Sequence, residues 1–369
     1  MGNKVKIALV FGTRPEAIKM CPLVNRLKQN TKFQVTTIVT AQHRQMLDSV
    51  LELFDVHPDY DLNLMKPNQN LWDLSSEIIL KTKEVLDKEK PDLVLVHGDT
   101  TTASMSALST FYSKIKIGHI EAGLRTFDKN YPFPEEINRV IIDNLSDLMF
   151  CPTDKSVQNL KNSGIKKGVY KTGNTVIDAL LYVIEKKSAN LDFIGLDKNL
   201  KTILLTSHRR ENFGKPLENI CYAVKELVEK HPDIQVVYPM HLNPNVRNTV
   251  IPILGNIKRV KLIEPLDYVP FCTLMKKSHI ILTDSGGVQE EAPALGVPVL
   301  VLRDETERPE AIESGSVRIA GTQKDKIINE VEKLLLNEFH YKSMSQAINP
   351  YGDGKACLYI EKIIQDYFS

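Results

Sequence analysis

The sequence predicts an α/β protein made of two domains, each built on a parallel β-sheet. Short apolar, β-branched runs alternate with longer amphipathic segments, which is typical of βαβ units. The alternation starts again after a polar stretch around Lys186 to Lys201, and 369 residues exceed what one core fills comfortably. We therefore expect one domain over residues 1–188 and a second over 189–354, with a helix over 355–369 that packs back on the first domain.

Buried strands are predicted along both halves of the chain. In the first half they cover KIALVFG, FQVTTIVTA and DLVLVHGD, with a further strand that ends at His119 and Ile120, and a helix over Glu16 to Gln29 lies between the first two runs. In the second half they cover TILLTSHR, IQVVYPMHL, KLIEPL, HIILTDSGG and VPVLVLRD. Open parallel sheets bind ligands at the carboxyl ends of their strands, so the residues directly after each run are the candidates for a site.

Composition limits the function. Lys and Arg number 47 against 46 Asp and Glu, so no overall field attracts the chain to nucleic acid or to an anionic membrane, and an anionic substrate has to be held locally. The five cysteines stand singly, which favours buried free thiols in a reducing compartment. No apolar run reaches membrane-spanning length and the N-terminus enters a strand directly. We predict a cytoplasmic protein without nucleic-acid or membrane partners.

Polar groups gather after the predicted strands of the first half. Arg14 follows a glycine turn at the first strand end, where its guanidinium suits a phosphate or carboxylate, and Lys19 lies on the next helix. The alternative for Arg14 is a surface salt bridge to Glu16. Because the arginine follows the carboxyl end of a strand, we favour the ligand-binding interpretation.

Carboxylates also converge at this predicted edge. They are Asp99, Glu121 and the neighbouring Glu135 and Glu136. General acid–base chemistry needs such groups side by side, in environments that separate their pKa values. Taken singly, Asp99 is explained as a helix N-cap and Glu121 as a partner of Arg125, but their joint placement favours catalysis.

The second half offers a candidate seat for an anion. Asp284 to Glu291 opens a helix with Ser285, Gly286 and Gly287, and this leaves backbone N–H groups free for a diphosphate. An ordinary N-cap with glycines for close packing explains the segment equally well. His208, Arg209 and Arg210 follow another strand of the same half.

No cofactor is indicated. Several histidines lie at or near strand ends (His43, His97, His119 and His241), but none has the spacing of a metal-ligand motif. The glycine pattern of a dinucleotide site and the phosphate-binding loop of ATPases are both missing. We predict neither a metal nor a cofactor.

The ordered motifs of the chain resemble one known family. They are FGTRPEAIKMCPL, TAQHRQMLD, VHGDTTTA, GHIEAGLRT, YPFPEEINR, GNTVIDAL, TSHRRENFG, PMHLNPNV, LTDSGGVQEEAPALGVPVLVLRDETERPEA and NPYGDGKA. Nearly end to end, they are similar to the non-hydrolysing UDP-N-acetylglucosamine 2-epimerases. The resemblance implies a GT-B fold, with two facing Rossmann-like domains and an active-site cleft between them, in a homodimer that needs neither metal nor nicotinamide.

The resemblance also assigns roles to residues. The catalytic positions of the family match Asp99, Glu121, Glu135 and His208. The positions that hold UDP match Arg14, Lys19, Leu266, Phe271, Ser285, Gly286, Gly287, Glu291 and Arg308. Leu266 stands where some members carry Gln, and backbone contact to the uracil is expected there. Some bacterial relatives bind a second UDP-N-acetylglucosamine as an activator through residues that match Gln42, Gln45, Arg209 and His241, although Asn68 replaces an arginine of that site.

The implied reaction is reversible epimerisation at carbon 2 of UDP-N-acetylglucosamine to UDP-N-acetylmannosamine, supplying surface polysaccharide synthesis. Carbon 2 is hardly acidic, so its proton leaves together with UDP by anti elimination to a 2-acetamidoglucal, and UDP then adds back. The alternatives are a hydrolysing 2-epimerase, which releases N-acetylmannosamine and UDP, a GT-B glycosyltransferase, and a non-enzymatic UDP-sugar sensor.

Overall fold

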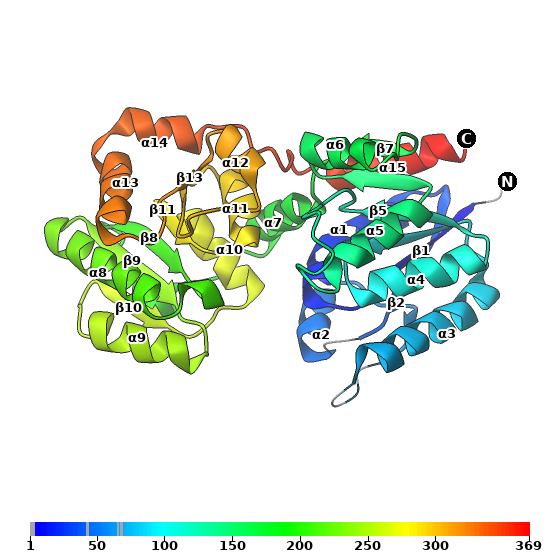
Figure 1. Ribbon diagram of the computed structural model, residues 1–369, viewed down its shortest axis with the longest axis horizontal. Coiled ribbons are helices and arrows are strands. Elements are labelled where there is room, and N and C mark those ends of the chain that lie inside the picture. The colour runs from blue at the N-terminus through cyan, green and yellow to red at the C-terminus, as the bar shows by residue number, and fades with distance from the viewer. Residues whose placement is uncertain (1–3, 42–43, 65, 67–68) are drawn as a thin grey trace. The chain divides into compact units, whose positions relative to one another are not determined.

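A computed structural model describes residues 4–41, 44–64, 66 and 69–369 of the chain (Figure 1). The chain forms two compact units, one made of Met1–Ala179 and Tyr351–Ser369 and the other of Leu180–Pro350. The division falls within helix α7 (Thr175–Lys186).

The first unit contains a seven-stranded sheet in the order β3-β2-β1-β4-β5-β6-β7, and every pairing is parallel. Its strands are β1 (Val5–Phe11), β2 (Phe33–Val39), β3 (Tyr60–Asp61), β4 (Leu93–His97), β5 (Lys116–Ile120), β6 (Leu148–Cys151) and β7 (Val169–Lys171). The helices between them are α1 (Arg14–Gln29), α2 (Arg44–Leu53), α3 (Leu71–Glu89), α4 (Thr101–Tyr112), α5 (Glu135–Leu145) and α6 (Asp154–Asn162).

The second unit repeats this plan with a six-stranded parallel sheet in the order β10-β9-β8-β11-β12-β13. The strands are β8 (Lys201–Thr206), β9 (Ile234–Pro239), β10 (Val260–Ile263), β11 (Ile280–Thr283), β12 (Val299–Val301) and β13 (Val317–Ile319). The α-helices are α8 (Lys215–Lys230), α9 (Pro244–Leu254), α10 (Tyr268–Lys277), α11 (Gly286–Glu291), α12 (Pro309–Glu313), α13 (Lys324–Leu336) and α14 (Glu338–Ser345). Short 3-10 turns are η1 (Asp192–Ile194), η2 (Arg210–Asn212) and η3 (Ala292–Leu295).

Both strand orders follow the Rossmann pattern, in which the order of the strands reverses beside the first strand of the sheet. The reversal lies between β1 and β4 in the first unit and between β8 and β11 in the second. The central strands are buried because sheets covered by helices on both faces need apolar residues on both sides. Ligands of open sheets with this strand order bind at the carboxyl ends of the two strands beside the reversal.

The C-terminal helix α15 (Ala356–Tyr367), red in Figure 1, belongs to the first unit and packs against α1. Its first turn is held by Asp178, whose carboxylate accepts from the backbone N–H groups of Ala356 at 3.1 Å and Cys357 at 3.0 Å. An ion pair between Arg26 and Glu361 joins α1 to α15. The end of the chain thus completes the first unit.

The α/β prediction with two parallel sheets is confirmed, and each predicted strand is present. The predicted helix over Glu16 to Gln29 begins two residues earlier because Thr13 caps it. Four strands were not among those predicted individually: β3, β6, β7 and β13, all of four residues or fewer. The five cysteines are buried and free, as expected. No helix in the described part of the chain combines the length and the apolar character needed to cross a bilayer.

Candidate functional site

The loop after β1 is organised by a buried carboxylate. Glu16 accepts from the backbone N–H groups of Gly12 at 3.1 Å and Thr13 at 2.8 Å, and from the hydroxyl of Thr100 at 2.7 Å. Burial raises the pKa of Glu16, although these hydrogen bonds oppose the shift. Glu16 therefore joins the loops after β1 and β4, the two strands at the reversal of the sheet.

Arg14 is left available by this arrangement. The alternative of a salt bridge between Arg14 and Glu16 is wrong, since Glu16 is turned into the loop. The Arg14 side chain is half-buried, and no hydrogen bond or ion pair joins it to any described residue. A guanidinium in this position can bind an anionic ligand without first breaking an internal pair.

Glu121 lies at the centre of the polar groups in the first unit. It follows β5, its carboxylate forms an ion pair with Lys19, and Asn174 donates to it at 2.8 Å. Its side chain is 12% exposed. The alternative of a pair with Arg125 is wrong, since Arg125 binds Asp143. Burial raises the pKa of Glu121, but the charge of Lys19 and the hydrogen bonds outweigh it and lower the pKa to about 2.

The backbone of Glu121 is strained. Its φ is 66°, in the left-handed region that non-glycine residues seldom adopt. Such a conformation costs on the order of 1–3 kcal/mol and persists where the surroundings fix it, commonly at functional sites. In this backbone conformation the Glu121 carboxylate contacts Lys19 and Asn174.

Asp99 is held as an ion pair rather than used as a helix cap. Its Oδ2 accepts from Arg139 Nε at 2.9 Å and Nη2 lies 2.8 Å away. The N-cap of α4 is Thr100, whose hydroxyl accepts from the backbone N–H of Ala103 at 3.0 Å, so the N-cap alternative for Asp99 is wrong. With 29% of its side chain exposed, the Asp99 carboxylate remains reachable by a ligand.

The two adjacent glutamates at the start of α5 have different surroundings. Glu136 is buried, accepts from the backbone N–H groups of Thr126 and Phe127 at 3.0 Å each, and pairs with Arg139. Glu135 is half-buried and has no hydrogen-bond or ion-pair partner among the described residues. Glu136 therefore supports the loop, while Glu135 presents a carboxylate that can act on a ligand.

A buried network that the sequence did not reveal lies behind Asp99. His119 contacts two acceptors, Asp143 Oδ1 at 2.6 Å through Nδ1 and the carbonyl oxygen of Gly98 at 2.7 Å through Nε2. Arg125 Nη1 lies 2.6 Å from the other oxygen of Asp143. Burial raises the pKa of Asp143, but the charges of His119 and Arg125 and their hydrogen bonds lower it overall. The network fixes the turn that carries Asp99.

In the second unit a fully buried carboxylate shapes the loop after β8. Asp284 Oδ2 accepts from Ser207 Oγ at 2.9 Å, from the backbone N–H groups of His208 and Arg209 at 2.9 and 3.0 Å, and from Asn212 Nδ2 at 3.0 Å. Asp284 follows β11, so it joins the two strands at the reversal of this sheet. Sequence reasoning placed Asp284 at a strand end but did not find this role.

His208 is presented at the surface of the second unit. Its side chain is 44% exposed, its Nδ1 lies 3.4 Å from Asp284 Oδ1, and its ring stacks on His241 with centroids 5.8 Å apart. Since the ring is anchored on one side and open on the other, it can donate to an anionic ligand.

Positive charge gathers at the start of α11. Ser285 is the N-cap residue of α11, as the N-cap alternative had it, but its side chain makes no capping hydrogen bond. A Cβ placed on Gly286 lies 3.5 Å from Arg308 Nη2 and 3.8 Å from Arg209 Nη2. The guanidinium groups are balanced by Glu290 and Glu307. Two cations beside free backbone N–H groups suit a diphosphate.

The remaining predicted UDP residues lie on the same side of this unit. Glu291 ends α11 and accepts from the hydroxyl of buried Tyr268 at 3.2 Å, and Gly287 lies beside its carboxylate. Leu266 is half-buried in the loop after β10, and Phe271 is half-buried on α10. Of the expected effector residues, Gln42 lies outside the described residues, as does Asn68, and only the backbone of Gln45 is described, in α2.

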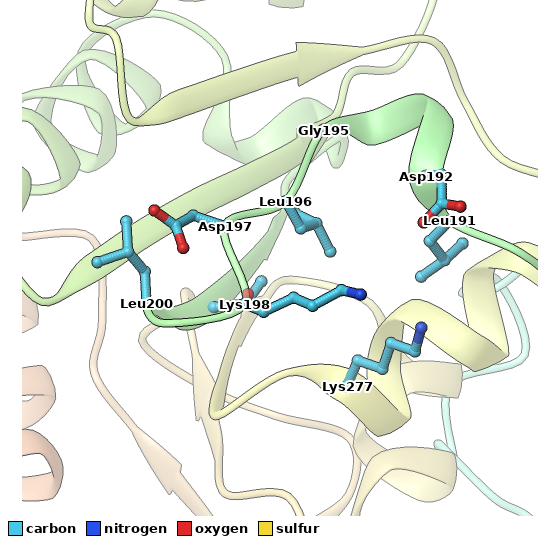
Figure 2. A pocket seen from close by; sticks show the side chains of 9 residues that line it. Leu191, Asp192, Gly195, Leu196, Asp197, Lys198, Leu200 and Lys277 are labelled. Atoms are coloured by element: carbon cyan, nitrogen blue, oxygen red, sulfur yellow. The ribbon is translucent and has the colours of Figure 1, made fainter.

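A pocket in the second unit lies away from these residues. Figure 2 shows a pocket of about 410 Å³ at the amino-terminal side of β8, where the ammonium groups of Lys198 and Lys277 point toward the same space. It contains none of the predicted site residues. Within the described part of the chain, no group of His, Cys, Asp and Glu side chains is arranged to hold a metal ion.

Two Rossmann-type units with polar strand ends define a GT-B-like α/β protein. Sucrose-phosphate synthase from Thermosynechococcus elongatus shares this fold, with a TM-score of 0.66 at 12% identity over 99% of both chains. The family described as UDP-N-acetylglucosamine 2-epimerase matches residues 25–365, and the chain belongs to that family.

Individual relatives are similar over nearly their whole length. The UDP-N-acetylglucosamine 2-epimerase of Escherichia coli K12 is 52% identical over 364 residues, which cover 96% of each chain. The crystal structure of the Neisseria meningitidis UDP-GlcNAc 2-epimerase bound to UDP-GlcNAc has a TM-score of 0.87 at 48% identity, covering 98% of this chain and all of that one.

Proposed function

We propose that this chain interconverts UDP-N-acetylglucosamine and UDP-N-acetylmannosamine without hydrolysis, by anti elimination of UDP to a 2-acetamidoglucal and its re-addition. The observation that carries the proposal is the set of three carboxylates in the first unit, each in a different state. Glu121 is ionised beside Lys19, Asp99 is paired with Arg139, and Glu135 has no partner among the described residues.

Three different environments suit a reaction that moves a proton off one face of carbon 2 and returns one to the other. An acid and a base must differ in proton affinity, and different partners produce that difference. We assign proton removal and proton return to Asp99, Glu121 and Glu135 together. Arg14 and Lys19 are assigned to the anionic substrate.

The second unit is assigned to UDP. Elimination leaves a diphosphate that must be stabilised as it departs and kept for re-addition. Arg308 and the N–H groups of Gly286 and Gly287 provide a cationic seat, with His208 as a further donor. Ser285, Glu291, Phe271 and Leu266 are assigned to the rest of the nucleotide. In the Neisseria meningitidis relative the bound ligand is UDP-GlcNAc, which supports this choice of substrate.

The test is the reaction of purified protein with UDP-N-acetylglucosamine in deuterated water. We expect a UDP-linked sugar with solvent deuterium at carbon 2, and only traces of free N-acetylmannosamine. Free sugar as the main product supports the hydrolysing alternative, and product that retains its original hydrogen throughout refutes elimination. Transfer of the sugar to an acceptor without epimerisation supports a glycosyltransferase.

Amide variants test the assigned carboxylates. Asp99→Asn, Glu121→Gln and Glu135→Gln are each expected to lower turnover by about a hundred- to ten-thousandfold, the range for general acid–base groups. His208→Ala is expected to lower it by about a hundredfold, as for loss of one preorganised donor. Glu305→Gln is a matched control, since Glu305 is exposed and has no assigned role.

The resemblance supports three further proposals: a homodimer, a cytoplasmic location, and use of the product in surface polysaccharide synthesis. A homodimer has twice the 41.7 kDa mass of one chain, and light scattering on the eluted protein measures that mass. Activation by a second UDP-N-acetylglucosamine through Gln42, Gln45, Arg209 and His241 predicts a sigmoidal dependence of rate on substrate. A hyperbolic dependence refutes activation.

A further inference from the structure

A buried histidine next to Glu121 has no partner of its own. His97 ends β4, is 3% exposed, and neither ring nitrogen forms a hydrogen bond with a described residue. Buried polar groups are nearly always hydrogen-bonded, so two unsatisfied nitrogens on one ring call for an explanation. An apolar side chain of similar size avoids this cost, which indicates that the imidazole has a use.

The ring faces the carboxylate that we assign to proton transfer. His97 Nε2 lies 3.8 Å from Glu121 Oε2, too far for a hydrogen bond but within reach after a small side-chain rotation. The other charged or titratable groups that act on His97 are Lys19 on α1 and His119 on β5. Burial and both of these groups disfavour the imidazolium, and Glu121 favours it. His97 is therefore neutral at rest.

We propose that His97 is a positioning residue that shares the proton taken up by Glu121 during epimerisation. This inference rests on the proposed function of Glu121. In the transfer, the Oε2–H bond of protonated Glu121 breaks and an Nε2–H bond of His97 forms, so the carboxylate regains its charge beside an imidazolium. The reverse transfer restores the proton to Glu121.

The surroundings explain why the transfer is confined to turnover. At rest the Glu121 carboxylate is held by Lys19 and Asn174, away from the imidazole. Protonation removes the negative charge that binds Lys19, which frees the carboxyl group to turn toward His97. Burial lowers the pKa of His97, and the charge of Lys19 outweighs burial and lowers the pKa of Glu121, so neither group holds the proton outside turnover.

The experiment compares His97→Gln with the wild-type protein. Glutamine keeps a polar group near the Nε2 position but accepts no proton. We expect kcat to fall by about tenfold to a hundredfold, which is a smaller decrease than for replacement of an acid–base residue itself. KM should stay within about threefold of the wild-type value. The pH profile of kcat should also change, because Glu121 must then titrate alone. His57→Gln is the matched control, since the His57 side chain is 90% exposed.

The outcomes separate the inference from the proposed function. If the wild-type protein gives no epimer, the proposed function fails. If it is active and His97→Gln keeps its kcat and pH profile, or loses activity only in proportion to its folded fraction, the inference is overturned.

Nitrogen-15 NMR of the wild-type histidines gives an answer that does not depend on a variant that folds. A neutral His97 ring at pH 7 with its proton on Nδ1 supports the proposal, because Nε2 must carry the lone pair. An imidazolium, or a proton on Nε2, overturns it.

Discussion

Asp284 is expected to be the main support of the loop that presents His208 and Arg209. Its Oδ2 receives four donors at 2.9 to 3.0 Å, and the residue is fully buried. The substitution Asp284→Asn keeps the shape of the side chain but removes the charge. An amide oxygen has two lone pairs, so it serves fewer donors and holds each less strongly.

The expected loss can be worked out from these contacts. A hydrogen bond to a charged group contributes about 1.5–3 kcal/mol and a neutral one about 0.5–1.5 kcal/mol, so four weakened bonds lose roughly 4 kcal/mol. Burying a neutral amide instead of a charge returns part of this. We expect a local loss of about 2–4 kcal/mol, which corresponds to a fall of about thirtyfold to a thousandfold in protection against exchange.

Hydrogen exchange at the amides of His208 and Arg209 is the appropriate assay. Both N–H groups donate directly to Asp284, and exchange reports local opening even where two units do not unfold as one. Asp325→Asn is the matched control, because the Asp325 side chain is 90% exposed. Weaker UDP binding should accompany the loss. If both amides stay within about threefold of wild-type protection in Asp284→Asn, this account of the loop is refuted.

Three further outcomes follow from the structure. Burial lowers the pKa of His97 from an unfolded value of about 6.5 to about 3, so the unfolded state binds the extra proton and stability falls as the pH drops below 6.5. Denaturation experiments should therefore show a loss of about 2 kcal/mol in unfolding free energy between pH 7 and pH 5, and this loss should be missing in His97→Gln. An equal loss in both proteins contradicts this. Thr13→Ala removes the cap of α1 and should cost about 1 kcal/mol, measured as a lower denaturation midpoint, whereas an unchanged midpoint would show that the cap contributes nothing. A thiol reagent should modify none of the five cysteines before the protein unfolds, because all five are buried and burial raises the pKa of Cys151 to about 12. Rapid reaction of the native protein would contradict this.

The sequence predicted where the site residues lie along the strands better than it predicted their hydrogen-bond and ion-pair partners. Alternation of apolar runs placed Glu121, Asp99 and Asp284 at strand ends because that signal is local and periodic. The partners depend on contacts across long separations, such as His208 to Asp284 over 76 residues and Lys19 to Glu121 over 102. Local pattern contains no record of such contacts, so the alternatives that paired Arg14 with Glu16 and Glu121 with Arg125 were wrong about the partners.

The residues that were missed share a physical reason. Asp143 lies in the last turn of α5, and His119 lies within β5, where a polar residue ordinarily has no special meaning. Only the folded sheet brings them together, with the Nδ1 atom of His119 against Asp143 and its Nε2 atom against the carbonyl oxygen of Gly98. Their signal was the presence of charged and polar residues in otherwise buried segments, which a buried element tolerates only when they are paired.

The charged groups of the two units are arranged differently. In the first unit Lys19 pairs with Glu121 and Arg139 with Asp99, so a carboxylate that gains a proton changes only a local pair. In the second unit the guanidinium groups of Arg209 and Arg308, which pair with Glu307 and Glu290, converge on Gly286 beside the backbone N–H groups of the first turn of α11. Paired carboxylates suit proton transfer, in which charge changes by one at a time. Converging cations suit a diphosphate that has to be held throughout. This difference in electrostatics is the physical reason to assign carbon 2 chemistry to the first unit and UDP to the second.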